Sequence, residues 1–247
     1  MQNCFECGKA RMWTPSPYWE DNRRWWHCRN CDHWQLEVPA QGLRIPPKVL
    51  YYDIETALIK MEVDVFDMRV RSGWLDWHDI TRPFYVISWA AAWVDDKTPR
   101  LYSDAVTGYE AKRRKDKRCL QGLWDLIDQA DYIVGHNVKA FDHKKIETRF
   151  LLNNMGRPSD CAAVDTLTLA KKYFKPESQA LDYWQTLFGG QNKDHMIRED
   201  WEEVNKGNQK IINKMHKYNR GDVQAGINLL HKFVDYIESN GGKKVFK

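Results

Sequence analysis

Four acidic residues and one tyrosine fall into three short motifs whose side chains could together bind metal ions. Asp53 and Glu55 lie in Tyr-Asp-Ile-Glu-Thr, Asp142 ends Gly-His-Asn-Val-Lys-Ala-Phe-Asp, and Tyr218 and Asp222 lie in Tyr-Asn-Arg-Gly-Asp-Val. Carboxylates are ligands that Mg²⁺ and Mn²⁺ prefer. Two such ions held close together can activate a water and stabilise the leaving oxygen of a phosphodiester. The motifs therefore predict a two-metal site for phosphodiester hydrolysis.

Spacing within two of these motifs places side chains on a common face. Asp53 and Glu55 lie two residues apart at the end of a β-prone run, Val-Leu-Tyr-Tyr, and alternate residues of a strand share a face. Two carboxylates on a buried strand are costly unless cations compensate them. Tyr218 and Asp222 lie four residues apart, which stacks them on one side of a helix. Gly221 between them weakens the prediction of an unbroken helix.

Other polar residues near the motifs have ordinary explanations. Asp142 opens a predicted helix, where an acidic residue also serves as a cap or matches the helix dipole. Asp165 precedes Thr-Leu-Thr-Leu-Ala and is expected to cap a helix. Cys119 and Cys161 are expected to be small buried apolar residues.

The apolar pattern predicts the elements that must position these residues. β-prone runs cover 49–52, 84–94, 100–103 and 132–134, and helical spacing covers 120–127, 141–154, 167–174, 180–188, 209–217 and 223–237. Strands first, with one helix between them and then helices, describe a mixed α/β sheet flanked by helices. Segment 57–83 has no clean period, and it could form an excursion that borders the substrate groove.

Composition divides the chain into parts. Residues 1–38 hold four of the six cysteines and few aliphatic residues, and 39–48 contains two consecutive prolines, which is typical of a linker. Residues 49–240 carry the three motifs and are expected to form the catalytic domain. Residues 241–247 are expected to be a loose tail.

Residues 1–38 contain two Cys-x-x-Cys pairs, Cys4 with Cys7 and Cys28 with Cys31. Their spacing predicts a zinc ribbon, in which four thiolates close a tetrahedral shell around one structural Zn²⁺. Metal binding would supply the stability that so short a segment lacks. Two disulfides are the competing interpretation, but they need an oxidising compartment. A neighbouring histidine could in principle replace a sulfur.

Bulk composition excludes several classes of protein. The chain is 43% hydrophobic and 29% charged, as in ordinary globular proteins, and no run approaches the roughly 20 apolar residues of a membrane span. We therefore expect no membrane association, and a reducing, cytoplasmic compartment. The net charge of +4 excludes a polycation, but Lys112–Arg118 holds six basic residues in seven. This run is either a solvated loop or helix start, or a contact for phosphates.

The three motifs resemble those of the DEDD superfamily of 3′→5′ exonucleases, whose fold is similar to ribonuclease H. Asp53-Ile54-Glu55-Thr56 resembles the first exonuclease motif, Asn137-x-x-x-Phe141-Asp142 the second, and Tyr218-x-x-x-Asp222 the third in its tyrosine form. The histidine form would need His at position 217, which is Lys217. The resemblance spans roughly 49–239 and is closest to the exonuclease domains of family B DNA polymerases and to stand-alone bacterial and phage relatives.

The resemblance implies a role for each matching residue. Asp53, Glu55 and Asp222 would bind the Mg²⁺ or Mn²⁺ ion that activates the attacking water, and Asp142 would assist a second ion. Tyr218 would orient the water, and one carboxylate, Glu55, would accept its proton. The substrate-binding residues would be Thr56, Asn137 and Phe141, the last of which could equally be a core residue. His136 is expected to shape its loop only, because Tyr218 occupies the activating position.

Three functions remain open at this point. The leading hypothesis is a two-metal 3′→5′ exonuclease on single-stranded DNA, in the cytoplasm of a bacterial or phage-infected cell. The second keeps the fold and chemistry but takes RNA, because no residue clearly detects a 2′-hydroxyl. The third is a non-catalytic module that binds nucleic acid or protein. The zinc ribbon could clamp the strand, pack against the nuclease domain, or contact replication or recombination proteins.

Overall fold

The computed structural model describes residues 13–20, 23–28, 31, 34–36, 47–62, 77–94, 99–189, 196–239 and 244–246. Cys4, Cys7, most of the predicted linker 39–48 and Trp74 lie outside the described residues.

A five-stranded mixed sheet, in the order β10-β9-β4-β7-β8, forms the centre of the main domain. Its strands are β4 (Val49–Thr56), β7 (Val86–Trp93), β8 (Tyr102–Ala105), β9 (Tyr132–Gly135) and β10 (Ala162–Asp165). β4 pairs with β9 in parallel and with β7 in antiparallel orientation, so it joins the two halves of the sheet. Its first residues are buried and rich in large apolar side chains, as expected for a central strand.

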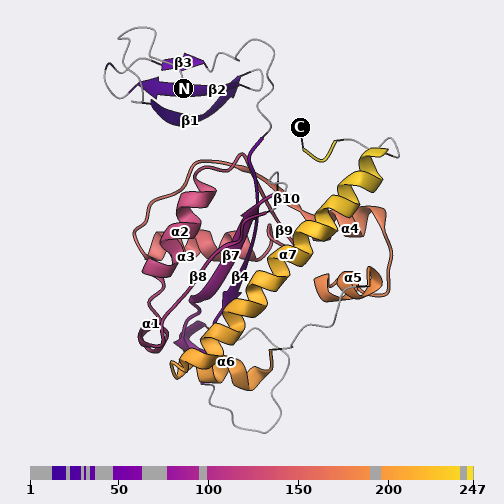
Figure 1. Cartoon of the computed structure of the whole chain (residues 1–247). Coiled ribbons are helices and arrows are strands. Elements are labelled where there is room, and N and C mark those ends of the chain that lie inside the picture. Colours follow the sequence, from indigo (N-terminus) through magenta and orange to yellow (C-terminus); the bar gives the residue numbers. More distant parts are fainter. Residues whose placement is uncertain are drawn as a thin grey trace.

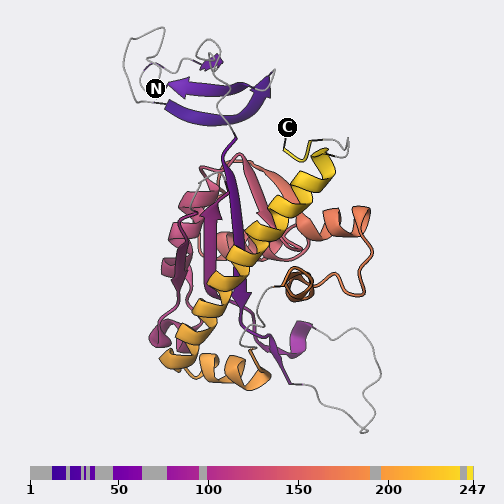
Figure 2. The same ribbon diagram turned by 45° about the vertical axis from the view of Figure 1, so that its right-hand side comes forward.

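Helices cover both faces of the sheet (Figures 1 and 2). They are α1 (Gly108–Arg113), α2 (Lys117–Ile127), α3 (Asp142–Leu152), α4 (Thr166–Tyr173), α5 (Leu181–Leu187), α6 (Arg198–Asn205) and α7 (Gln209–Ser239). α2 and α3 pack on one face, and α7 crosses the other diagonally, from α6 toward α4 and α5. This arrangement confirms the predicted mixed sheet flanked by helices, which is consistent with a ribonuclease H-like fold.

The alternation of β4 decides which face carries the acidic residues. Leu50, Tyr52 and Ile54 belong to the core under α2 and α3, whereas Val49 and Tyr51 belong to the core under α7. Further along β4 the same alternation places the side chains of Asp53 and Glu55 on the α7 face.

α7 is one helix of 31 residues, so the prediction of two separate helices at 209–217 and 223–237 was wrong. Gly226 allows α7 to lie close to the sheet, because a Cβ there would overlap the ring of Tyr51. α1, α6 and β10 were not predicted, and the expected strand at 100–103 lies at Tyr102–Ala105.

Residues 13–36 contain a separate three-stranded antiparallel sheet, where the sequence predicts the zinc ribbon. Its strands are β1 (Trp13–Glu20), β2 (Arg23–Cys28) and β3 (Trp34–Leu36). Cys28 ends β2 and is buried, and Cys31 follows in a turn. The zinc ion therefore stays a prediction.

Segment 57–83 contains short regular elements, whereas the sequence predicts none there. Segment 57–83 contains β5 (Lys60–Met61), the 3₁₀ helix η1 (Trp77–Asp79) and β6 (Ile80–Arg82), of which β5 and β6 pair in antiparallel orientation.

At the C-terminal end, Val245 N donates to Glu238 Oε1 (3.0 Å) and Phe246 packs edge-on against Tyr132. These residues of the predicted loose tail therefore contact the domain.

The basic run Lys112–Arg118 includes residues that hold the fold together. The guanidinium of Arg114 donates to the carbonyl of Pro83 (2.6 Å), and Arg118 pairs with Asp104 (2.7 Å). Contacts within the domain thus account for the positive charges of Arg114 and Arg118, two of the six basic residues, and no phosphate is needed to explain them.

Within the described residues, no helix combines the length and the apolar character that crossing a membrane requires.

Candidate metal centre

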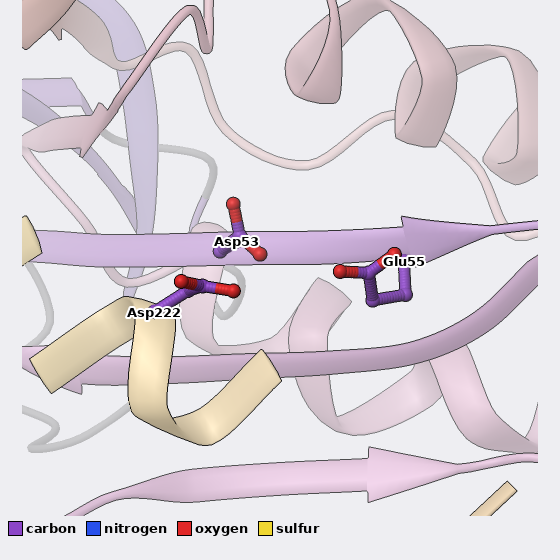
Figure 3. A group of neighbouring side chains, drawn as sticks. All are labelled: Asp53, Glu55 and Asp222. Carbon is purple, nitrogen blue, oxygen red and sulfur yellow. The ribbon is translucent and has the colours of Figure 1, made fainter. Parts of the chain in front are cut away.

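Three acidic side chains from β4 and α7 converge on the α7 face of the sheet (Figure 3). Asp53 and Glu55 extend from β4, and Asp222 reaches them from α7. One carboxylate oxygen from each of the three lies within 4.8 Å of the other two. Two motifs that are far apart in the sequence therefore form one acidic cluster, as the sequence predicts.

Asp142 reaches the same strand from its edge. β4 pairs with β9 only through Val49, Leu50 and Tyr51, so Ile54 lies beyond that pairing. α3 begins beside this edge, and Asp142 Oδ1 accepts a hydrogen bond from the backbone N–H of Ile54 (3.3 Å). The Asp142 carboxylate is buried, with 4% of the residue exposed. The short β9 thus leaves the space in which the second motif meets the first.

Asn219 is a site residue that the sequence analysis missed. It is fully buried, and its Nδ2 donates to Asp53 Oδ2 (2.5 Å), while its Oδ1 accepts from Ser88 Oγ on β7 (3.4 Å). It lies three residues before Asp222 and so on the same side of α7. Two features of the sequence could have identified Asn219 as a site residue. They are its spacing from Asp222 and its polar side chain on the sheet-facing side of a helix.

Burial and neighbouring charge raise the pKa of Asp53 and Asp142. Burial raises the pKa of Asp53 well above its usual range, and the nearby charges of Asp142, Glu55 and Asp222 raise it further, while the hydrogen bond from Asn219 lowers it. Burial also raises the pKa of Asp142, to about 7. Like charges held together in this way oppose ionisation unless cations are present.

The donor set fits divalent cations. Carboxylate oxygens are hard ligands that suit Mg²⁺ and Mn²⁺, and positive charge would relieve the repulsion that raises the pKa of Asp53. The cluster of Asp53, Glu55 and Asp222 can therefore bind divalent metal ions.

Tyr218 lies half-buried on the same helix, one turn before Asp222. Burial raises the pKa of its hydroxyl, and the neighbouring charges of Asp222, Glu55 and Asp53 raise it further. The hydroxyl therefore remains protonated at neutral pH and is able to donate a hydrogen bond.

The loop of the second motif is held by Asp165. The Asp165 carboxylate caps α4 by accepting from Leu167 N (2.9 Å), which confirms the predicted cap. It also accepts from the backbone N–H of Asn137 (3.0 Å) and Lys139 (3.1 Å). Asn137 has a left-handed backbone, with φ of 69°, which these two hydrogen bonds stabilise.

Three side chains with predicted secondary roles lie close to these motifs. His136 contacts Thr166 Oγ1 (3.0 Å) and the carbonyl of Gln179 (2.8 Å), in agreement with the expectation that it shapes the loop. Phe141 is 41% exposed, so the alternative that it is a core residue does not hold. Thr56 is half-buried at the end of β4, directly after Glu55.

Cysteines outside the predicted ribbon match expectation in part. Cys119 is buried in the core under α2, and Cys161 is half-buried and packs against that core.

Comparison with known proteins places this domain in a family. A model of the RNase_H superfamily matches residues 81–234, which is more than half of the chain. The chain therefore belongs to the RNase H superfamily. The matched residues include Asp142, Tyr218 and Asp222, whereas β4 precedes them. No curated protein matches the chain.

Among solved structures, the chain is similar to the family B DNA polymerase from the hyperthermophilic archaeon Pyrobaculum calidifontis, with a TM-score of 0.57 and 20% sequence identity. The similarity covers 83% of this chain and 26% of that one, so this chain spans about a quarter of the polymerase. At this identity the likeness concerns the fold. Fold, family and acidic cluster together support a metal-dependent nuclease.

Proposed function

We propose that the protein is a metal-dependent 3′→5′ exonuclease that hydrolyses single-stranded DNA and releases nucleoside 5′-monophosphates. The convergence of Asp53, Glu55 and Asp222 is the observation that carries the proposal. Asp142 reaches the same strand, and Tyr218 lies close enough for its pKa to respond to all three carboxylates of the cluster. These five residues are the acidic and tyrosine positions of the three motifs that resemble those of the exonucleases.

Each of these side chains has a task in the proposed reaction. Asp53, Glu55 and Asp222 would hold Mg²⁺ or Mn²⁺, and Asp142 would support a second ion from the edge of β4. Two such ions supply an activated water and stabilise the leaving oxygen. The protonated hydroxyl of Tyr218 orients the attacking water by donating a hydrogen bond, and Glu55 accepts the proton that the water loses.

Phe141, Asn137 and Thr56 would hold the terminal nucleotide. The exposed ring of Phe141 precedes Asp142 directly, and an exposed aromatic ring is suited to stacking on an unpaired base. Asn137 lies in the loop that Asp165 fixes. DNA is favoured over RNA because the motifs resemble polymerase exonuclease domains.

The test is digestion of one oligonucleotide labelled in turn at each end. With Mg²⁺ or Mn²⁺, a 3′→5′ exonuclease releases a 3′ label at once as a mononucleotide and shortens a 5′-labelled strand stepwise. Asp53→Asn and Asp222→Asn should each lower the rate by a factor of about 100 or more, because each removes a metal ligand. Asp235→Asn, an exposed position on the same helix, is the matched control and should keep full activity.

Other results would change or remove the proposal. Stepwise shortening of a matched RNA but not of the DNA would make the enzyme an exoribonuclease of the same fold. Binding of the strand with no metal-dependent shortening of either polymer would make it a non-catalytic binding module. Release of the 5′ label first would contradict the direction.

A further inference from the structure

Two phenylalanines and a lysine form a small cluster at the start of α3. The ammonium of Lys145 lies 3.7 Å from the centre of the Phe84 ring and 5.4 Å from that of the Phe141 ring. Phe141 and Lys145 are four residues apart, so they lie on the same side of the first turns of the helix. The lysine therefore presents one positive charge between a half-buried ring and an exposed one.

Two connections link the group of Lys145, Phe84 and Phe141 to the end of β4 that carries the metal centre. Lys145 follows Asp142 by about one helical turn, and the Asp142 carboxylate contacts Ile54 N between the two acidic residues of β4. Phe84 precedes Tyr85, whose carbonyl accepts from the N–H of Ala57 (2.9 Å) just beyond the end of β4. Both connections lead to the same end of the same strand.

The charge of Lys145 has no carboxylate partner among the described residues, where the ion pairs involve other cations. Arg149 provides a contrast on the same helix. Its guanidinium lies 6.0 Å from the centre of the Phe84 ring, but Asp116 neutralises it at 2.7 Å. Partial burial lowers the pKa of Lys145, so its ammonium has lost some hydration that an anion could replace.

We propose that Lys145, held between Phe84 and Phe141, binds a phosphodiester group of the single-stranded nucleic acid whose 3′ end enters the metal centre. This inference rests on the proposed function. The acidic cluster alone repels a polyanionic strand, and the ammonium of Lys145, about one helical turn from Asp142, attracts it. The exposed Phe141 ring beside the ammonium offers a surface for a base, so ring and charge together match one nucleotide unit.

Salt dependence of binding tests the proposal. The probe is a fluorescent oligothymidylate with phosphorothioate linkages at its 3′ end, which resist hydrolysis, in the presence of Mg²⁺. Lys145→Gln should weaken binding about tenfold at low salt and should reduce the slope of log K against log[salt] by about 0.7, the loss of one phosphate contact on a single strand. Lys145→Arg retains the charge and should keep the slope.

Lys144→Gln is the matched control, because this neighbouring lysine is exposed and points elsewhere around the helix. It should change affinity by about twofold or less. Equal affinities and slopes for Lys145→Gln and wild type, or equal losses in both glutamine variants, would overturn the assignment. Failure of the wild-type protein to shorten any oligonucleotide would instead remove the proposed function, and the slope comparison would still decide the role of Lys145.

Discussion

Among single residues, Asp53 is linked to both the acidic cluster and a buried amide of α7. It shares the acidic cluster with Glu55 and Asp222, and one of its oxygens is fixed by Asn219. A side chain that already points correctly spends less free energy when a metal binds. The buried amide is therefore expected to act on the metal through Asp53.

Asn219→Ala removes the donor to Asp53 and leaves a partly buried oxygen without its hydrogen bond. We expect Mg²⁺ or Mn²⁺ to bind about 10-fold to 100-fold more weakly, as for other residues that orient metal ligands. Calorimetric titration of the metal measures this directly. Asn213→Ala on the exposed side of the same helix is the control, and equal metal affinities in the two variants would refute the role of Asn219.

The raised pKa of Asp142 predicts how stability without metal depends on pH. Its carboxyl titrates near 7 in the folded protein and near about 3.9 in an unfolded chain. The protonated group therefore favours the folded state below about pH 4, and this contribution is lost as the pH rises toward about 7.

Denaturant unfolding in EDTA at about pH 5 and about pH 8 checks this prediction, with Asp142→Asn as the comparison. The wild type should lose more stability than Asp142→Asn between the two values, and Mg²⁺ should restore more stability at the higher one. A larger loss of stability in Asp142→Asn than in the wild type would contradict the predicted pH dependence.

Among the elements, α7 does most to assemble the site. It supplies Tyr218, Asn219 and Asp222 within little more than one turn, and further along it packs on β4 through Val223 and Ile227. The distance between helix and sheet sets the separation of the carboxylates. Gly226 sets that distance, because its missing side chain leaves room for a tyrosine of β4.

Gly226→Ala is therefore expected to destabilise the protein although alanine favours helices. The new methyl group overlaps the ring of Tyr51, and overpacking of this kind costs about 1–3 kcal/mol. Denaturant unfolding measures the loss, and metal affinity should fall with it as α7 shifts. Gln224→Ala, exposed on the same helix, should leave both unchanged. Wild-type stability in Gly226→Ala would show that the sheet and helix adjust freely.

Local patterns were enough to predict β4 and the shared face of Asp53 and Glu55, because strand alternation depends only on neighbouring residues. α7 was predicted as two helices because Tyr-Asn-Arg-Gly-Asp interrupts its apolar pattern. Tyr218, Asn219 and Asp222 in this stretch are polar because they belong to the site, and contacts with the sheet maintain the helix there. Asn219 was missed since its partners, Ser88 and Asp53, are 131 and 166 residues away.

At the scale of the whole molecule, a small antiparallel sheet accompanies the RNase H domain. Cys28 and Cys31 lie at the end of β2 and in the turn after it, where one half of a zinc shell would be. The segment is short, so its stability is expected to depend on the metal.

Elemental analysis of the purified protein should therefore find one zinc per chain. Cys28→Ser and Cys31→Ser should each lose the metal and unfold this small sheet, whereas Cys119→Ser should keep the zinc. Two disulfides and no zinc would support the competing interpretation. Removal of the zinc is expected to leave the Mg²⁺ affinity of the acidic cluster unchanged, because the two sites share no ligands.

The wide separation of the ligands along the chain has a consequence for biosynthesis. Asp222 follows Asp53 by 169 residues, and a ribosome makes the intervening chain before the last carboxylate exists. Nascent polypeptides thus carry the central strand without the helix that completes the site, and they lack one of the three carboxylates of the acidic cluster. Under the proposed function, unfinished copies are therefore expected not to hydrolyse nucleic acid, and no separate inhibitor is needed.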